Sequence, residues 1–274
     1  MNDVDCIALL QWALPQLGLQ WSGFRKVQRQ VCKRLKRRIT ELQLDNFAAY
    51  RARLAVDAAE WIILDQCCHI TISRFFRDKG LFETLRRRVL PEIAVRAKRE
   101  QRDARIWSAG CASGEEPYSL KILWDLEIAD LFPEVSVSII ATDIDNTMLA
   151  RAREGCFKAT SLHDLPPHLV GQAFDHVGSL FCIRPRHRKA IDFRYQDLRL
   201  ETPTAVFDLI LCRYVAFTYF VPPLQNRILT QILDRLSPDG YVVVGAHERI
   251  AAVETPLLRL DDSLQIFRKS TSAR

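Results

Sequence analysis

The chain has 274 residues, of which 48% are hydrophobic, and it carries a formal net charge of +6. This composition excludes an intrinsically disordered chain, and the length accommodates one large domain together with a smaller one. No 18-residue uncharged apolar run occurs, and no basic segment followed by an apolar one opens the chain, so we expect a cytoplasmic protein without a membrane span or signal peptide.

Cysteine spacing gives no sign of a metal centre. The eight cysteines are scattered, the one close pair is adjacent (Cys67 and Cys68), and no CxxC spacing occurs. For a cytoplasmic protein we therefore expect reduced, mostly structural thiols and no metal site.

Residues 1–90 predict an all-helical N-terminal domain, because apolar residues recur at helical spacing and glycine is almost absent before Gly80. The net positive charge belongs to the N-terminal third of the chain. Residues 1–102 hold 20 Lys plus Arg against 11 Asp plus Glu, whereas the whole chain holds 39 against 33.

The densest basic segment is residues 24–42, which predicts a helix with one apolar stripe and several basic faces. Three interpretations remain open at this point: a solvated face without a partner, a nucleic-acid or membrane surface, and a docking face for an acidic protein. The residues alone favour the solvated face, and the scarcity of aromatic residues gives little support to base stacking.

Residues 91–274 alternate strand and helix patterns after a charged connector at residues 96–105. Such alternation predicts an α/β fold with a mostly parallel sheet and right-handed crossovers. Residues 262–270 could add an antiparallel edge strand. The expected strands are 106–109, 135–142, 190–198, 205–213 and 241–246, and the expected helices are 117–132, 146–155 and 222–236.

The most informative motif is RIWSAGCASGEEPYS at residues 105–119, followed by SIIATDID at residues 138–145. Gly110 and Gly114 let the backbone approach a ligand, and Asp143 ends the next strand, where an acid accepts hydrogen bonds from ribose hydroxyls. The motif therefore predicts a nucleoside site at the carboxyl ends of the strands. GxGxxG and GxxxxGK[ST] are both absent, which argues against a dinucleotide or phosphate chain. A turn that binds no ligand is the competing interpretation.

Five blocks of the sequence resemble the CheR-type chemotaxis protein methyltransferases in order and spacing: SRFFRD, RIWSAGCASGEEPYSL, ATDIDNTMLARAREGCF, FDLILCRYVAF and LSPDGYVVVGAHE. The resemblance extends from about residue 22 to about residue 269. It implies a Rossmann-like S-adenosylmethionine-dependent methyltransferase domain at 91–274, with a small antiparallel β insertion within about 171–197. It also implies methylation of chemoreceptor glutamates to glutamyl methyl esters, with S-adenosylhomocysteine as the product.

The resemblance further implies roles for individual residues. Arg77 and Tyr219 are the catalytic candidates, Arg77 as the cation that holds the acceptor carboxylate. Together with Gly110 of the turn, the residues implied to bind the cofactor are Thr71, Ser73, Arg77, Glu116, Asp143, Asp197, Leu198, Arg213 and Tyr214. Without the resemblance, Arg77 reads as a surface arginine paired with Asp78 or Glu83, and Tyr219 as an aromatic core residue.

In the family the basic helix faces the acidic methyl-accepting helices of the receptor. The resemblance therefore makes docking to an acidic helical receptor domain, rather than to nucleic acid, the leading interpretation, with Arg29, Lys33, Lys36 and Arg37 as the docking residues. Methyl transfer to a carboxylate needs no general base, because the acceptor is already ionised at pH 7.

The chain departs from the family pattern at several positions. Tyr214 and Asp197 stand where the family usually has asparagine, YVAFTYF is one residue longer than usual, and GAHE replaces GHSE. Two alternatives therefore remain: a binding module for S-adenosylmethionine or its product that has no activity, and a methyltransferase with a different protein or small-molecule acceptor.

Overall fold

The computed structural model describes residues 2–250, 255–261 and 263–270. The chain divides into two compact units, residues 1–70 with 218–225, and residues 71–217 with 226–274. The boundary expected near residue 90 instead falls between residues 70 and 71. Residues 71–90 belong to the second unit because side chains such as Phe75, Phe82 and Val89 lie in its core. None of the described helices is long and apolar enough to span a membrane.

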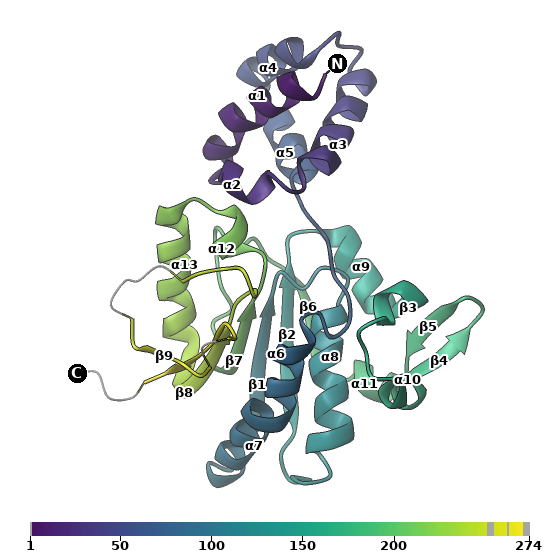
Figure 1. Ribbon diagram of the computed structural model, residues 1–274, viewed down its shortest axis with the longest axis vertical. Helices are drawn as coiled ribbons and strands as arrows, with labels where there is room; N and C mark the ends of the chain where they lie inside the picture. Colours follow the sequence, from purple (N-terminus) through teal and green to yellow (C-terminus); the bar gives the residue numbers. More distant parts are fainter. Residues whose placement is uncertain (1, 251–254, 262, 271–274) are drawn as a thin grey trace. The chain divides into compact units, whose positions relative to one another are not determined.

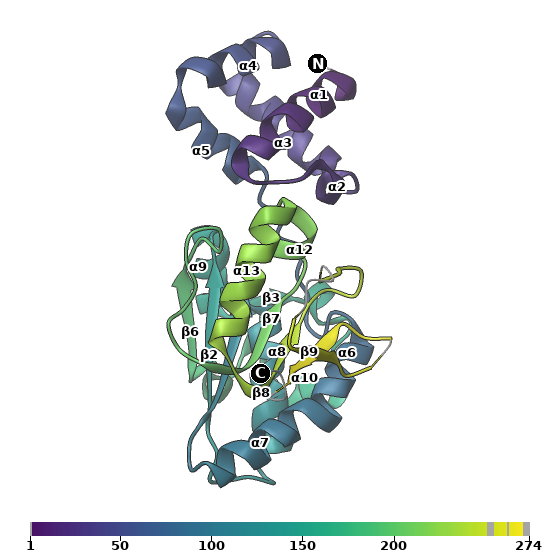
Figure 2. The ribbon, with the colours of Figure 1, turned by 90° about the vertical axis from the view of Figure 1, so that its left-hand side faces the viewer.

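The first unit is helical, as the sequence predicts (Figures 1 and 2). Its core holds buried side chains from several helices, among them Leu10, Leu35 and Tyr50. Residues 218–225 also belong to this unit, and a β-bridge pairs Phe220 with Leu19. Its elements are α1 (Asp3–Ala13), η1 (Leu14–Leu17), α2 (Trp21–Phe24), α3 (Gln28–Glu41), α4 (Phe47–Val56) and α5 (Ala58–Cys67).

The basic segment is shorter as a helix than its sequence predicts. Helix α3 begins only at Gln28, and Phe24 ends the separate helix α2. The buried stripe of α3 is Val31, Cys32, Leu35 and Ile39, which follows the helical repeat. Apolar burial therefore fixes one face of α3, and the basic residues occupy the remaining faces.

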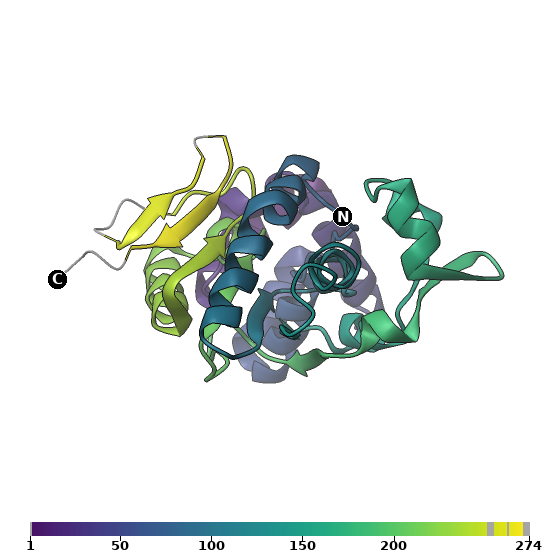
Figure 3. The same cartoon turned by 90° about the horizontal axis from the view of Figure 1, so that it is seen from below.

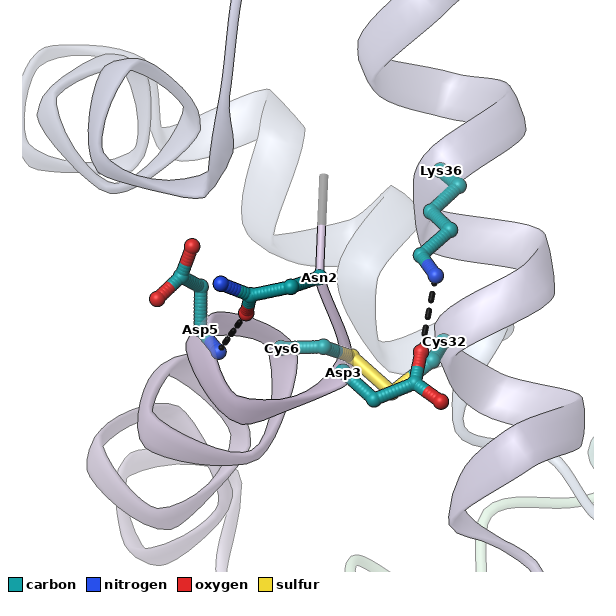
Figure 4. The surroundings of a disulfide bond; sticks show 6 residues. All are labelled: Asn2, Asp3, Asp5, Cys6, Cys32 and Lys36. Carbon is teal, nitrogen blue, oxygen red and sulfur yellow. Dashed lines mark hydrogen bonds and ion pairs between the residues drawn. A yellow bond between two sulfur atoms is a disulfide. The ribbon is translucent and has the colours of Figure 1, made fainter.

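Four of the eight cysteines form disulfides, which corrects the expectation of reduced thiols throughout. Cys6 of α1 is bonded to Cys32 of α3, and Figure 4 shows this bond beside the ion pair between Lys36 and Asp3. A second disulfide joins Cys156 to Cys182. Spacing along the sequence could not reveal these pairs, since each joins cysteines brought together only by the fold.

The second unit is built on a seven-stranded sheet with the order β6-β2-β1-β7-β8-β10-β9. The strands from β6 to β8 are parallel, and β10 and β9 add antiparallel edge strands. The predicted α/β fold is thus confirmed. The strands are β1 (Ala104–Ala109), β2 (Val137–Asp143), β6 (Ile191–Tyr195), β7 (Phe207–Cys212), β8 (Leu236–Val243), β9 (Leu257–Arg259) and β10 (Ile266–Lys269).

All 6 residues of the central strand β7, FDLILC, are buried. Asp208 is the one polar residue in this otherwise apolar strand. The helical elements of this unit are α6 (Lys79–Thr84), η2 (Leu85–Val89), α7 (Leu90–Arg99), α8 (Glu115–Leu123), η3 (Trp124–Ile128), α9 (Asn146–Glu154), η4 (Ala159–Leu162), α10 (Pro167–Ala173) and α11 (Pro185–Arg188). Two further helices, α12 (Ala216–Tyr219) and α13 (Pro222–Arg235), include residues of both units.

A separate three-stranded antiparallel sheet has the order β3-β5-β4 and consists of β3 (Cys156–Lys158), β4 (Phe174–Val177) and β5 (Leu180–Ile183). Figure 3 shows the β4–β5 hairpin at the end of the unit opposite to β9 and β10. The insertion expected within 171–197 therefore contains β4 and β5. Strand β3 lies before that range, and β6, within it, pairs with β2 in the large sheet.

Candidate functional site

The turn after β1 requires glycine at position 110. Strand β1 lies between β2 and β7, with Ala109 paired to both Thr142 and Cys212. Gly110 follows with a φ of +75°, and a Cβ added there would lie 2.3 Å from Val215 Cγ2. Only glycine fits this position, because any side chain would meet both a steric block and an unfavourable backbone conformation.

Asp143 connects this turn to the end of β2. Its Oδ2 accepts a hydrogen bond of 2.7 Å from the Ala112 backbone N–H, and its Oδ1 accepts one of 2.9 Å from the Asp145 N–H. Asp143 therefore lies beside the turn at Gly110, as the sequence motif predicts. Asp145 in turn caps α9 by accepting from the N–H groups of Thr147 and Met148.

Arg213 is the centre of a buried cluster formed by three parts of the second unit. Its Nη1 donates to Glu116 Oε2 at 2.8 Å and its Nη2 to Asp78 Oδ2 at 2.6 Å. Burial lowers the pKa of Arg213, but the charges of Glu116 and Asp78 outweigh it, and the pKa is raised overall. Ser108 donates to the second oxygen of Glu116 at 2.7 Å. Arg213 Nε is buried and has no hydrogen-bond partner among the described residues.

Tyr214 joins this cluster to Arg77. The Tyr214 hydroxyl donates to Asp78 Oδ2 at 2.6 Å, and the Arg77 guanidinium lies over the Tyr214 ring at 3.8 Å from its centroid. Arg77 also donates to the Ile72 carbonyl at 2.7 Å. Burial lowers the pKa of Arg77, although an arginine remains cationic at neutral pH.

The surface-pairing interpretation of Arg77 is not what the structure shows. Asp78 pairs with Arg213, while Glu83 pairs with Arg86 and Arg87. No ion pair joins Arg77 to a carboxylate in the described parts of the chain.

Four other predicted cofactor residues lie on two segments of the same unit. Thr71 and Ser73 precede Arg77 in a stretch without helix or strand. Leu198 is buried after β6, beside Asp197. The Asp197 carboxylate is engaged by Arg199, whose Nε and Nη2 donate at 2.9 and 2.8 Å. Sequence reasoning noted the aspartate but did not find this partner.

Two carboxylates of the cluster were not among the predicted site residues. Asp78 accepts from both Arg213 and Tyr214. Glu248, which is buried, accepts from the Tyr214 N–H at 2.8 Å and the Gly245 N–H at 2.5 Å. Asp78 ends the block SRFFRD and Glu248 ends the block LSPDGYVVVGAHE, so the signal available in the sequence was an acid at the end of each of these blocks.

Tyr219 and the four docking candidates fall in the first unit. The Tyr219 ring packs on Phe24 with 5.0 Å between centroids, and its carbonyl accepts from the Gln20 N–H at 2.8 Å. On α3, the side chains of Arg29, Lys33 and Arg37 are exposed. Lys36 pairs with Asp3 at 2.7 Å and Arg37 with Glu41 at 3.3 Å, whereas no ion pair involves Arg29 or Lys33 within the described residues.

Comparison with known families matches residues 71–262 to the CheR methyltransferase, SAM binding domain model, which is more than half of the chain. A probable chemotaxis protein methyltransferase of Rhizobium etli is 34% identical over 231 residues, covering 81% of this chain and 84% of the relative. A chemotaxis protein methyltransferase of Listeria innocua is 30% identical, covering 85% and 86%. Chemotaxis protein methyltransferase 2 of Pseudomonas aeruginosa is 31% identical, covering 80% and 77%. The chain therefore belongs to the CheR methyltransferase family, and S-adenosylmethionine is its cofactor.

Proposed function

We propose that this chain transfers the methyl group of S-adenosylmethionine to glutamate side chains of a chemoreceptor-like protein, forming glutamyl methyl esters. The single observation that carries the proposal is the state of Arg77, a half-buried cation that pairs with no carboxylate of the described chain. Three relatives named as chemotaxis protein methyltransferases support methyl transfer in chemotaxis.

The residues of the site fit the cofactor. Gly110 allows Val215 to pack against the turn after β1, and beside this turn Asp143 is an acid at the ribose-binding position of the strand end. Glu116 supplies a carboxylate for a cationic group, and Arg213 Nε is a buried donor that the described protein leaves unsatisfied. We propose that Glu116, Asp143 and Arg213 hold the cofactor, with Thr71, Ser73 and Leu198 in the same pocket.

When bound, S-adenosylmethionine supplies a methyl group already activated on a sulfonium. The protein's own contribution is therefore to bind and orient the acceptor. A glutamate carboxylate is ionised at pH 7 and needs no base, and a guanidinium can hold it through two parallel N–H···O bonds. We assign this task to Arg77. Holding acceptor and donor in line supplies rate through proximity rather than proton transfer.

The exposed basic side chains of α3 support docking to an acidic partner. Arg34 and Arg38 of the same helix are used within the unit, since Arg34 donates to the Cys67 carbonyl and Arg38 pairs with Glu60. Arg29 and Lys33 are exposed and make no ion pair within the described residues. We propose that Arg29, Lys33, Lys36 and Arg37 steer an acidic helical domain of the receptor toward the enzyme.

The test is methyl transfer from radiolabelled S-adenosylmethionine to the purified cytoplasmic domain of a chemoreceptor from the same genome. We expect base-labile label that disappears when the acceptor's methylated glutamates are replaced by alanine. Arg77→Ala should abolish most transfer, whereas Arg74→Ala, which removes a neighbouring exposed arginine paired with Asp164, should not. Cofactor binding without any transfer would favour a binding module, and label on small molecules alone would favour another acceptor class.

A further inference from the structure

We infer that Tyr214 is a positioning residue: its ring fixes the plane of the Arg77 guanidinium, so that the acceptor carboxylate meets an arginine that is already oriented. This inference rests on the proposed function, because it concerns the cation that we assign to the acceptor. It differs from the role expected at this position, which is contact with the cofactor.

The Arg77 guanidinium is held in two ways. Its Cζ lies over the Tyr214 ring, 3.8 Å from the centroid, and Nη1 donates to the Ile72 carbonyl at 2.7 Å. A guanidinium has five N–H donors, so the contact with Ile72 leaves others for a carboxylate. A side chain with four rotatable bonds would otherwise have to be ordered when the acceptor binds, at an entropic cost.

Tyr214 is itself held by the surrounding chain at both ends. Its N–H donates to the buried Glu248, and its hydroxyl donates to Asp78 and accepts from the Ala246 N–H at 3.2 Å. Its φ is +58°, a conformation that a bulky residue adopts only when the surroundings impose it. A Cβ added at Gly245 would lie 2.6 Å from Tyr214 Cε1, so the ring occupies space that Gly245 keeps open.

The two roles for Tyr214 make different predictions. A cofactor contact would lower affinity for S-adenosylhomocysteine when it is removed, and it would act whether or not Arg77 is present. If the Tyr214 ring instead positions Arg77, replacing Tyr214 would have an effect only when Arg77 is present. The effect would be a slower methyl transfer to the acceptor. Asparagine is the informative replacement, because it tolerates a positive φ and so leaves the backbone unstrained.

The decisive experiment is a double-mutant cycle with Arg77→Ala, Tyr214→Asn and the double variant, measured as kcat/KM for the acceptor at saturating cofactor. We expect Tyr214→Asn to lower kcat/KM about tenfold in the parent enzyme, in the range of a cation–π contact, and to have no further effect in the Arg77→Ala background. Affinity for S-adenosylhomocysteine, measured by calorimetry, should change by less than about threefold. Equal losses in both backgrounds, or a matching loss of cofactor affinity, would overturn the inference.

Tyr214→Phe separates the ring from the hydroxyl. It keeps the platform under Arg77 but removes the donor to Asp78, which Arg213 still pairs. We expect a clearly smaller loss of kcat/KM than with Tyr214→Asn. Equal losses from the two variants would show that the hydroxyl and not the ring matters, and the platform would be rejected.

A spectroscopic measurement keeps this inference separate from the proposed function. In protein labelled with ¹⁵N-arginine, the Arg77 Nε–Hε signal, identified by its loss in Arg77→Ala, should be shifted by the Tyr214 ring current. The shift should persist in Tyr214→Phe and vanish in Tyr214→Asn. If no glutamyl ester forms but this pattern is seen, the proposed function fails and the platform stands. If the ester forms and the signal is insensitive to Tyr214, the platform fails alone.

Discussion

Arg213 and Glu116 form an ion pair of 2.8 Å that joins the residue after β7 to the first turn of α8. Neither element would position its side chain alone: the pair forms because β7 and the strand that leads into α8 are neighbours in the sheet. The carboxylate and the buried guanidinium therefore reach the site already paired, and removing one charge changes the surroundings of the other.

Glu116→Gln should weaken binding of S-adenosylhomocysteine at least about tenfold, because hydrogen bonds to charged groups contribute about 1.5–3 kcal/mol. Titration calorimetry measures this directly. Glu115→Gln is the control: this neighbour is buried and accepts from Ser113, outside the cluster. Similar losses for the two variants would mean that the helix start as a whole, and not the Glu116 carboxylate, is responsible.

Asp143→Asn should also weaken cofactor binding, about tenfold, by replacing an ionised acceptor with an amide. The substitution further disturbs the turn, since Asp143 accepts from both Ala112 and Asp145. Asp145→Asn is an appropriate comparison, because asparagine caps a helix as well as aspartate does and the cap of α9 is retained. Cofactor affinity that is unchanged in Asp143→Asn would contradict the ribose-binding assignment.

Reversing the charges of Arg29 and Lys33 to glutamate should raise KM for the receptor domain about tenfold at low salt, and the effect should shrink as salt screens the attraction. These two residues are preferable to Lys36 and Arg37, whose reversal would also break ion pairs within the unit. Affinity for S-adenosylhomocysteine should stay unchanged. Reversal of Arg105 and Lys189 is the control, because both are exposed in the second unit and form no ion pair within the described residues. An equal rise in KM there would indicate nonspecific attraction.

Removing the Cys6–Cys32 disulfide with Cys6→Ala/Cys32→Ala should lower the free energy of unfolding by about 2–4 kcal/mol, the usual effect of a cross-link that closes a loop of this size. Denaturant unfolding under non-reducing conditions provides the measurement. Cys67→Ala, which removes a half-buried free thiol, should cost much less. Peptide mapping that recovers Cys6 and Cys32 as free thiols from the non-reduced protein would contradict the bond.

Asp208→Asn should destabilise the protein by about 3 kcal/mol, because it leaves Arg96 and Arg102 without their shared buried carboxylate. Asp192→Asn, which breaks an exposed pair with Arg194, should cost less than about 1 kcal/mol. Chemical denaturation of both variants measures the two losses.

The cost of Asp208→Asn should also depend on pH. Burial raises the pKa of Asp208, but hydrogen bonds from Arg102 and the Arg105 backbone outweigh it and hold the pKa below its ordinary value. The contribution is thus complete above the unfolded-state pKa, about 3.9, and is lost as the pH falls through the lower folded-state pKa. The stability difference between the parent and Asp208→Asn should be constant from pH 7 to about 5 and shrink below about 4. A difference that grows on acidification would contradict this assignment.

Hydrophobic periodicity and sequence motifs predicted much of the fold of the second unit. The apolar run at residues 207–212 is a central strand, and the turn at Gly110 and the acid at Asp143 lie together as expected. These features are local: alternation, glycine and strand ends are visible in a short window of sequence. The ends of helices were less visible, since α3 begins at Gln28 and not near Phe24.

Contacts between distant segments could not be predicted in this way. The partners of Arg213 come from residue 78 and residue 116, and the disulfide partners of Cys6 and Cys156 are each 26 residues away. The motif glutamate at 116 could be named from the sequence, but its buried arginine partner depends on the order of strands in the sheet. The same holds for Arg77 and the Tyr214 ring, which come from different elements of the second unit.

Because residues 218–225 belong to the first unit, residues 1–70 alone do not make up the whole helical unit. Leu19 bridges to Phe220, and Gln20 donates to the carbonyl of Tyr219. A fragment ending at residue 70 would lack these partners, and recombination at a single crossover would transfer the helices without the eight-residue segment that belongs with them. We expect natural or engineered exchange of the helical unit between relatives to succeed only when both stretches are inherited together.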